Sequence, residues 1–511
     1  MRLRSILFLV LLSFLASSII GQDEDKLEFF VGPELEEQRG NSIWKTFGHS
    51  DDFFFCMRAD RRKKGQFLIE KIGVDSLTVL KTVQFQLSEV SGKLPVMAYP
   101  MSTKNASFLI ATAEDQDGSD IFIMAYSITD DLQIKKEPLI IGIADREALI
   151  SENGFLTFKS EDEKKVALFI PKERNPVRNE KFELRYFDSG LNLLEIKNIE
   201  IPYPSANVLL EDAVLTPNGV FHGVISIQNE SEVRILPNSY ALLTYHPAED
   251  GVKEKALSLG NKWFYDVNLT VTPDTNLWLS GYYSNMVEPS MVGTFSVVIA
   301  SDTGELLDTG LSPFDRDFRL MFRQDMKSDQ DDLGLFKLEE AFLKKNGLLS
   351  MISEKRFSRE STIYEPATRM YTTVQVHYYE EILITTIRPS SKIMENILIP
   401  KYQSAYQQFG RYTSYVSTQW GDKLLFFYND HFRNESLSPT EYNNYRSLNN
   451  ENNMNITYCV VSDGKLIKKT LKPETTDDYY LDAGQHYRTS NSQILTTYKG
   501  YKTKYLKVLT P

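Results

Sequence analysis

The chain has 511 residues, of which 42% are hydrophobic and 25% charged, and its formal net charge at pH 7 is −12. This acidic balance argues against general nucleic-acid binding, which requires a basic surface. The hydrophobic content is typical of a globular protein, and the 30 Phe and 27 Tyr residues favour β-strands.

The N-terminus has the pattern of an export signal. Two arginines, Arg2 and Arg4, precede an apolar run over roughly residues 6–15, and small residues follow. We therefore expect residues 1–21 to be a cleaved signal peptide, with a retained anchor as the alternative, and residues 22–511 to form one exported domain. This predicts a periplasmic, cell-surface or extracellular protein. Removing the signal changes the net charge to −14, since it takes away two arginines. No later stretch predicts a membrane span.

From about residue 26 onward, short apolar strands alternate with polar turns, without a long helical period. One turn, between the first two strands of each unit, recurs eight times, and in several units it is Asn-Gly or a similar pair suited to tight hairpins. These turns are Ser50-Asp51, Lys104-Asn105, Asp162-Glu163, Asn218-Gly219, Asp274-Thr275, Asn346-Gly347, Gly421-Asp422 and Asn491-Ser492. The repeat predicts an all-β fold, a β-propeller of eight blades with four strands each, named A to D from the axis outward. Seven blades are the alternative if one unit is divided wrongly.

The last unit lacks a fourth strand. Its third strand, Tyr505–Leu509, ends the chain, whereas Lys26–Val31 is an unpaired strand at the start. Pairing the two would complete the eighth blade and remove both exposed edges. We therefore expect a ring closed by the N-terminal strand.

The chain has two cysteines, Cys56 and Cys459. Both lie in apolar strands, and the predicted blades that contain them are not adjacent. Export would permit a disulfide, but this placement favours two buried free thiols.

The longest connections join strands B and C. They are Pro171–Asn179, Gln228–Pro237, Ser284–Met291, about Phe357–Arg369, and His431–Asn455. In a propeller, the B–C and D–A connections lie on one face, and the long D–A segment Phe314–Asp332 would join them there. Elaborated loops on a regular scaffold often carry binding. The pattern predicts a binding face.

The most polar end of a predicted B strand contains Asn429, Asp430, His431 and Arg433. Asp430 and His431 could transfer a proton or hold a metal with a third ligand. The alternative is a polar loop base whose side chains cap the local backbone. No second histidine lies nearby in the sequence, so we expect a binding role at most, without a metal.

Basic residues recur in the same set of loops. Arg174 and Arg178 belong to the third unit, Arg356 and Arg359 to the sixth, and residues 61–64 add four more in the first. If these loops converge, they could hold an anionic glycan or a carboxylate. The alternative is solvated hairpin tips.

No catalytic signature is present: the sequence contains no Gly-x-Ser-x-Gly elbow, Walker loop or His-Glu-x-x-His motif. The acidic loop over residues 114–120 resembles part of a calcium loop but lacks the downstream Glu of an EF-hand. We expect no catalytic residue, metal or cofactor, and a monomer that binds a protein or a glycan. The alternative is a carbohydrate-active enzyme with two carboxylates near the central channel.

Three segments resemble a known group of proteins. Tyr378–Ile384, Ile397–Gln403 and Leu424–Asn434 are similar to parts of exported Bacteroidetes proteins without assigned activity. The resemblance covers roughly the last third of the chain. It implies a cell-envelope or extracellular setting and supplies no catalytic residue.

Overall fold

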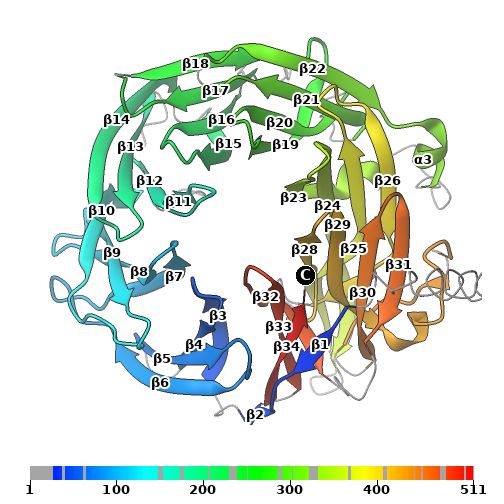
Figure 1. The fold of residues 1–511 in the computed structure, drawn as a ribbon, viewed down its shortest axis with the longest axis horizontal. Coiled ribbons are helices and arrows are strands. Elements are labelled where there is room, and N and C mark those ends of the chain that lie inside the picture. Colours follow the sequence, from blue (N-terminus) through cyan, green and yellow to red (C-terminus); the bar gives the residue numbers. More distant parts are fainter. Residues whose placement is uncertain are drawn as a thin grey trace, which may run out of the picture.

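The computed structural model describes residues 27–36, 41–60, 65–147, 154–172, 178–204, 208–228, 239–249, 251–285, 291–301, 303–321, 332–365, 370–406, 411–441, 444–450, 453–471, 479–499 and 502–509. These residues form eight antiparallel sheets arranged in a ring (Figure 1). The predicted signal peptide lies outside the described residues.

Seven of the sheets are built from strands that follow one another in the chain. The strands of blades 1 to 4 are β3 (Asn41–Phe47), β4 (Phe53–Asp60), β5 (Gln66–Gly73) and β6 (Val79–Gln86); β7 (Val96–Ser102), β8 (Ser107–Glu114), β9 (Asp120–Ile128) and β10 (Leu139–Asp145); β11 (Leu156–Lys159), β12 (Lys165–Pro171), β13 (Asn179–Asp188) and β14 (Leu193–Pro204); and β15 (Val208–Leu215), β16 (Phe221–Ile227), β17 (Ser239–Tyr245) and β18 (Val252–Leu257). The strands of blades 5 to 7 are β19 (Trp263–Val271), β20 (Leu277–Ser284), β21 (Gly293–Ile299) and β22 (Leu306–Pro313); β23 (Phe336–Leu343), β24 (Leu349–Glu365), β25 (Met370–Ile387) and β26 (Ile393–Ile399); and β28 (Tyr415–Trp420), β29 (Lys423–His431), β30 (Met454–Ser462) and β31 (Lys465–Thr470).

Blade 8 joins the two ends of the chain. It contains β32 (Tyr480–Arg488), β33 (Ser492–Lys499), β34 (Lys502–Leu509) and β1 (Phe29–Val31), and β2 (Leu35–Glu36) also pairs with β34. Phe29 lies opposite Val508 in an antiparallel register. The predicted closure by the N-terminal strand is confirmed, and the fold is an eight-bladed β-propeller.

The first strand of each blade lies nearest the axis. Strand β3 contacts β7 and β32, β15 contacts β11 and β19, and β19 contacts β23, so successive A strands form the inner wall seen in Figure 1. Seven of the eight predicted A–B turns lie between the first and second strands of a blade, and the eighth, Asn491-Ser492, ends at the first residue of β33. Gly219 and Gly347 have φ of +90° and +77° in these turns, a region that glycine adopts without strain.

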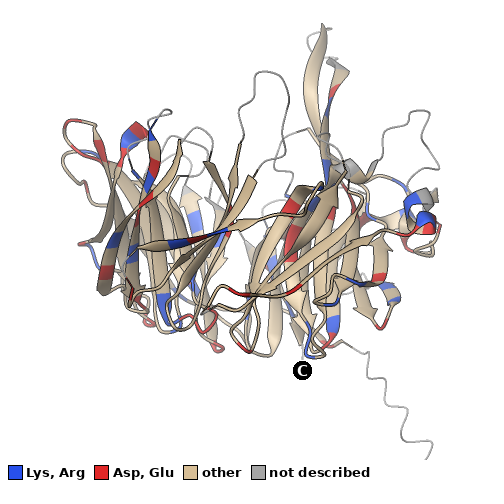
Figure 2. Ribbon diagram, turned by 90° about the horizontal axis from the view of Figure 1, so that it is seen from above, with Lys and Arg blue, Asp and Glu red and all other residues tan. Residues whose placement is uncertain are grey.

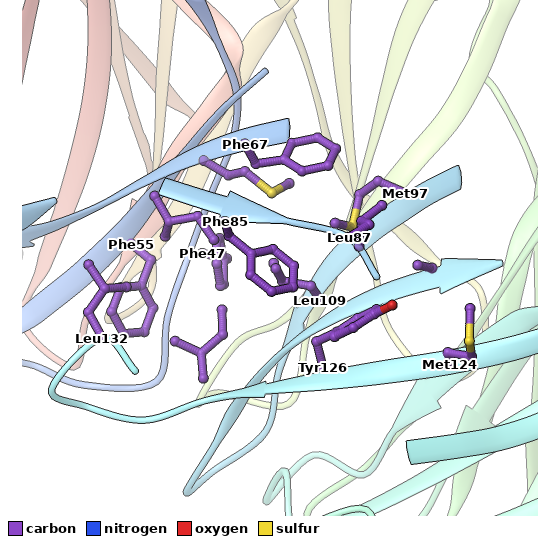
Figure 3. Packing of buried hydrophobic residues seen from close by; sticks show 14 of the residues in the cluster. Phe47, Phe55, Phe67, Phe85, Leu87, Met97, Leu109, Met124, Tyr126 and Leu132 are labelled. Carbon is purple, nitrogen blue, oxygen red and sulfur yellow. The ribbon is translucent and has the colours of Figure 1, made fainter. Parts of the chain in front are cut away.

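The cores lie between neighbouring blades. Blade 1 packs Phe55, Phe67 and Phe85 against Leu109 and Tyr126 of blade 2 (Figure 3). The rings of Phe85 and Tyr126 meet edge-on, with centroids 5.3 Å apart. Second strands are buried on both faces, as the continuous apolar runs predict.

Both cysteines are buried free thiols, as predicted. Cys56 lies in β4 of blade 1 and Cys459 in β30 of blade 7, so blade 8 lies between the blades that contain them.

One predicted connection is wrong. A loop was expected over about Phe357–Arg369, but β24 continues to Glu365 and β25 begins at Met370, and residues 366–369 lie outside the described residues. The sequence here is rich in Thr, Val and Tyr, which favour strands. The D–A segment after blade 5 also contains short helices, α3 (Arg316–Met321) and η2 (Asp332–Leu335).

Within the described residues, no helix has the length and apolar character needed to cross a membrane.

Candidate functional site

The longest strands of the molecule belong to blade 6. Strands β24 and β25 have 17 and 18 residues, and Figure 2 shows their hairpin rising above one face of the disc. Strand β23 pairs with β24 only as far as Lys355, and β26 pairs with β25 only from Ile382 onward. Beyond these points the two strands pair with each other. We call this part, residues 356–365 and 370–379, the blade 6 ribbon.

The ribbon has open edges. The short strand β27 (Gln403–Ala405) pairs with residues 377–379, and no other described strand pairs with the ribbon. In a two-stranded antiparallel ribbon, alternate backbone N–H and C=O groups point away from the partner strand. The edges at residues 356–365 and 370–376 therefore offer a template for a further strand.

Apolar side chains accompany these edges. Met370 is 62% exposed and Tyr371 is 74% exposed. Lower on the ribbon, the rings of Phe357 and Tyr378 stack with centroids 4.7 Å apart and planes 9° from parallel. The guanidinium of Arg359 lies 4.8 Å from the Phe357 ring centroid. The ribbon therefore combines exposed apolar surface with a cation.

A bulge marks the start of the ribbon. The register of the β24–β25 pair shifts between Glu354 and Arg356. The shift leaves Lys355 of β24, and Glu380 and Glu381 of β25, outside the regular pairing of these two strands. These three residues form ion pairs instead. The Lys355 Nζ atom lies 3.0 Å from Glu380 Oε2 and 3.4 Å from Glu381 Oε2. Ion pairs thus connect the two strands at the bulge, where the regular pairing of residues is interrupted.

A second ion pair lies deeper, and both its members are fully buried. Lys401 Nζ lies 2.7 Å from Glu354 Oε1. It also donates to the Tyr379 carbonyl oxygen and to Gln403 Oε1, each at 3.0 Å. Burial lowers the pKa of Lys401, while the charge of Glu354 opposes this shift. These contacts tie the ribbon base to the chain that follows blade 6.

Arg356, a predicted site residue, belongs to this base. It forms an ion pair with Glu354, and its Nη1 atom lies 2.9 Å from Glu339 Oε1. Arg356 and Arg359 therefore both lie on the ribbon, Arg356 in the ionic base and Arg359 exposed above it. Their different surroundings predict different roles: Arg356 orients the ribbon, whereas Arg359 is accessible to a partner.

Arg178, the predicted site residue of the third unit that the structure describes, does not lie beside them. It is exposed immediately before β13 in blade 3, and blades 4 and 5 separate it from blade 6 (Figure 1). Arg174 and residues 61–64 lie outside the described residues.

Asn429 and Asp430 are buried at the end of β29, with 1% and 2% exposure. Asn429 Nδ2 donates to the carbonyl oxygens of Tyr412 (2.9 Å) and Leu481 (2.8 Å), and its Oδ1 accepts from the Leu481 N–H at 2.8 Å. It thereby joins blade 7 to blade 8. A ligand would not reach this side chain in the described conformation.

Asp430 pairs with a lysine of the same blade. Lys468 Nζ lies 2.9 Å from Asp430 Oδ2, and Asn434 Nδ2 donates to Oδ1 at 2.7 Å. Burial raises the pKa of Asp430, and Lys468 opposes this shift. The contacts hold the base of the long B–C segment of blade 7.

His431 and Arg433 are closer to the surface. His431 Nδ1 accepts a hydrogen bond from the Arg433 N–H at 3.1 Å and caps the short helix η3 (Phe432–Asn434). Burial lowers the pKa of His431. The side chains of Asp430 and His431 therefore serve different local structures, and their role in binding stays a prediction.

The alternative function, a carbohydrate-active enzyme, requires two carboxylates near the central channel, and the inner strands carry Asp212 and Asp266. Asp212 Oδ2 accepts from the Leu269 N–H of the next blade at 2.7 Å, and Asp266 Oδ2 accepts from the Leu338 N–H of the next blade at 2.8 Å. The other oxygen of each carboxylate accepts from the following residue of its own strand. Burial raises the pKa of Asp212 to about 6 and also raises that of Asp266. These contacts link blades 4, 5 and 6, and a catalytic pair stays a prediction.

The acidic loop of blade 2 is organised by its own hydrogen bonds. Asp115 Oδ1 accepts from the Ser119 N–H at 2.9 Å, and Glu114 lies within 3.0 Å of Lys93 Nζ and 3.4 Å of Arg146 Nη2. Among the described residues, no three or more His, Cys, Asp or Glu side chains are grouped so that they could hold a metal ion.

No protein-family model matches the chain, and no curated protein matches it in sequence. Similar solved structures include the WD40 domain of SCAP from fission yeast, with 10% identity, coverage of 95% of both chains and a TM-score of 0.40. The polysaccharide lyase Uly1 has 9% identity, covers 83% of this chain and 94% of its own, and has a TM-score of 0.39. A protein of unknown function from Dyadobacter fermentans has 8% identity, covers 93% of this chain and 100% of its own, and has a TM-score of 0.31. Identities this low carry no information on ligand or activity.

Proposed function

We propose that this protein is an exported, non-catalytic binding propeller that holds an extended segment of a protein partner along the edge of the blade 6 ribbon. The observation that carries the proposal is the combination of open backbone edges with exposed apolar side chains on a hairpin that rises above the disc. An added strand gains main-chain hydrogen bonds from such an edge, and side-chain contacts give specificity.

The surroundings of the edge favour a protein over a glycan. Backbone donors and acceptors at strand spacing match another extended polypeptide, whereas a glycan has no such repeat. Met370 and Tyr371 offer apolar contact, and Arg359 would pair with an acidic residue of the partner. An acidic protein of this kind would also select partners whose binding segment carries little excess negative charge.

The export of this protein stays a prediction. It is based on the sequence pattern of residues 1–21 and on the resemblance to exported Bacteroidetes proteins. Mass spectrometry of the chain recovered from the periplasm or medium tests it. We expect a mature N-terminus near Gln22 and a monomer in solution. A full-length chain that stays in the cytoplasm would contradict the proposed location.

The binding role can be tested with a photo-reactive p-benzoylphenylalanine in place of Tyr371, introduced in the native host. We expect a discrete cross-linked protein, which can then be purified for affinity measurements. The same probe at Leu307, which is 50% exposed on β22, is the control. In a second variant, residues 358–377 are replaced by Asn-Gly, which shortens the hairpin while keeping the Phe357–Tyr378 pair.

The shortened variant should keep its melting temperature and lose affinity for the cross-linked protein at least tenfold. Equal affinity of the shortened and native proteins would contradict the proposal. Enrichment of glycans rather than proteins, in a parallel glycan array that depends on the ribbon, would contradict the choice of a protein partner.

A further inference from the structure

We infer that the face opposite to the blade 6 ribbon contains a second site, a pocket that binds a small amphipathic anion. The pocket lies where the inner strands of blades 3 to 7 end in their A–B turns and has a volume of about 770 Å³. In an antiparallel blade, the A–B turns lie at the opposite end from the B–C connections, so this pocket is separate from the ribbon. Its volume is within the roughly 300–1,000 Å³ typical of small-molecule sites.

The floor of the pocket is apolar and preformed. Val271, Val298 and Leu343 line it together with Trp278, which is 2% exposed. Trp278 Nε1 donates to Ser296 Oγ at 2.7 Å, and Ser296 in turn donates to the Pro389 carbonyl oxygen. The tryptophan nitrogen is thus satisfied inside the protein and offers no hydrogen-bond donor to the pocket.

The rim on the side of blade 6 is also held in place. The Lys345 N–H donates to Asp422 Oδ1 of the next blade at 2.9 Å. Gln419 Nε2 donates to the Leu343 carbonyl oxygen at 3.2 Å. Because two blades fix this turn, its lysine is presented from an ordered backbone, which limits the entropy lost when a ligand binds.

The two ends of the pocket differ in charge. At the blade 6 end, Lys344 is buried beside Glu395, with Nζ and Oε1 3.4 Å apart, and Lys345 is exposed without an ionic partner among the described residues. At the blade 3 end, Lys159 forms an ion pair with Glu163, and Glu161 adds a further negative charge. The blade 6 end therefore offers one exposed ammonium group, that of Lys345, at the turn where the Asp422 carboxylate accepts the Lys345 N–H, whereas the blade 3 end is negative.

The remaining carboxylate in the lining, that of Asp274, belongs to the A–B turn of blade 5, between the two ends of the pocket. Asp274 accepts hydrogen bonds from Thr272 Oγ1 and from Asn276 Nδ2, the latter at 2.7 Å, within its own turn. The hydrogen bond from Thr272 is the main cause that lowers the pKa of Asp274. Asp274 therefore stays charged, and these hydrogen bonds hold its carboxylate within its own turn.

These features select a class of ligand. An apolar body would lie on the floor formed by Val271, Val298 and Leu343, and one acid group would point to Lys345. A carboxylate, sulfonate or sulfate would serve equally well, since the contact at Lys345 is a charge contact with little geometric demand.

The probe for this site is 8-anilino-1-naphthalenesulfonate, which has an aromatic body and one sulfonate. We expect saturable fluorescence with one site on the native protein, and about fivefold weaker binding to Lys345→Glu. Lys465→Glu, on an exposed lysine at a C–D turn of the same side of the disc, is the matched control and should bind as the native protein does. The neutral analogue N-phenyl-1-naphthylamine should bind Lys345→Glu and the native protein alike.

Ala341→Phe is a second variant, because it places a larger side chain in the lining. It should weaken both probes, with folding checked by its melting temperature. If this variant does not fold, the comparison of sulfonate affinity between the native protein and Lys345→Glu tests the inference by itself. Non-saturable binding, or equal affinity of the sulfonate for the native protein and Lys345→Glu, would overturn the inference. Loss of partner binding at the ribbon would leave this result unaffected, so the two proposals fail separately.

Discussion

The interface between blades 1 and 2 and the base of the blade 6 ribbon are both buried, but they are built from opposite kinds of side chain. The first is a continuous apolar cluster around Phe55 and Tyr126. The second is an ion cluster around Glu354 and Lys401, both fully buried. Apolar burial stabilises a fold without defining direction, whereas buried ion pairs need specific partners. The contrast indicates that apolar packing stabilises the disc, whereas buried ion pairs fix the direction in which the ribbon leaves it.

The largest expected effect is on the apolar side of this comparison. Phe55 is fully buried, and its ring centroid lies 5.5 Å from that of Phe47. Phe55→Ala should lower the free energy of unfolding by about 4 kcal/mol, because it removes buried area and leaves a cavity. Urea denaturation measures the change. A loss below about 1 kcal/mol would show that this interface does not carry the stability of the disc.

On the charged side, Lys401→Met should lower the free energy of unfolding by about 3 kcal/mol. The cost arises because Glu354 stays buried, although Arg356 still contacts it. The double variant Lys401→Met with Glu354→Gln should recover most of the loss, since no buried charge is then left without its partner. Denaturation of both variants tests this, and failure of the double variant to recover would show that the pair acts through something other than charge balance.

A pH-dependent prediction concerns the inner strands. Burial raises the pKa of Asp212 to about 6, above its ordinary value of 3.8. Between these values the folded protein binds more protons than the unfolded chain, so this residue makes stability fall as pH rises from about 4 to 6, by about 1–3 kcal/mol. Asp212→Asn should remove this part of the slope. Denaturation curves of both proteins across this range measure it, and identical slopes would contradict the shifted pKa.

The smallest expected effect is on the accessible part of the ribbon. Arg359 is exposed, and its contact with the Phe357 ring is worth about 0.5 kcal/mol at such a site. Arg359→Ala should therefore leave the melting temperature within about 2 °C of the native value while weakening partner binding. A large loss of stability would place this residue in the structural base with Arg356.

The repeat, the number of blades and the closure of the ring could be predicted because each depends on local chemistry. Turn pairs such as Asn218-Gly219 determine hairpins over a few residues, and an unpaired strand at each end of the chain needs a partner. The ribbon could not be predicted in the same way. Most of its described residues are exposed or half-buried, so residues such as Ser358 and Thr373 show no apolar alternation.

The contacts of the candidate site were harder to predict than the fold. Glu354 and Lys401 are far apart in the sequence, and no local pattern links them. Asn429 and Asp430 looked like surface residues because they are polar and end a strand, yet they are buried among partners from other segments. Sequence shows which residues are polar, but the fold decides which of them face solvent.

Hydrogen exchange on the protein alone and in complex with its cross-linked partner tests the central claim most directly. If an added strand lies along the ribbon, backbone amides in residues 356–365 or 370–376 become protected in the complex, and the disc strands β12 and β16 are unchanged. Protection confined to other loops of the disc, with the ribbon amides exchanging as freely as before, would contradict the claim.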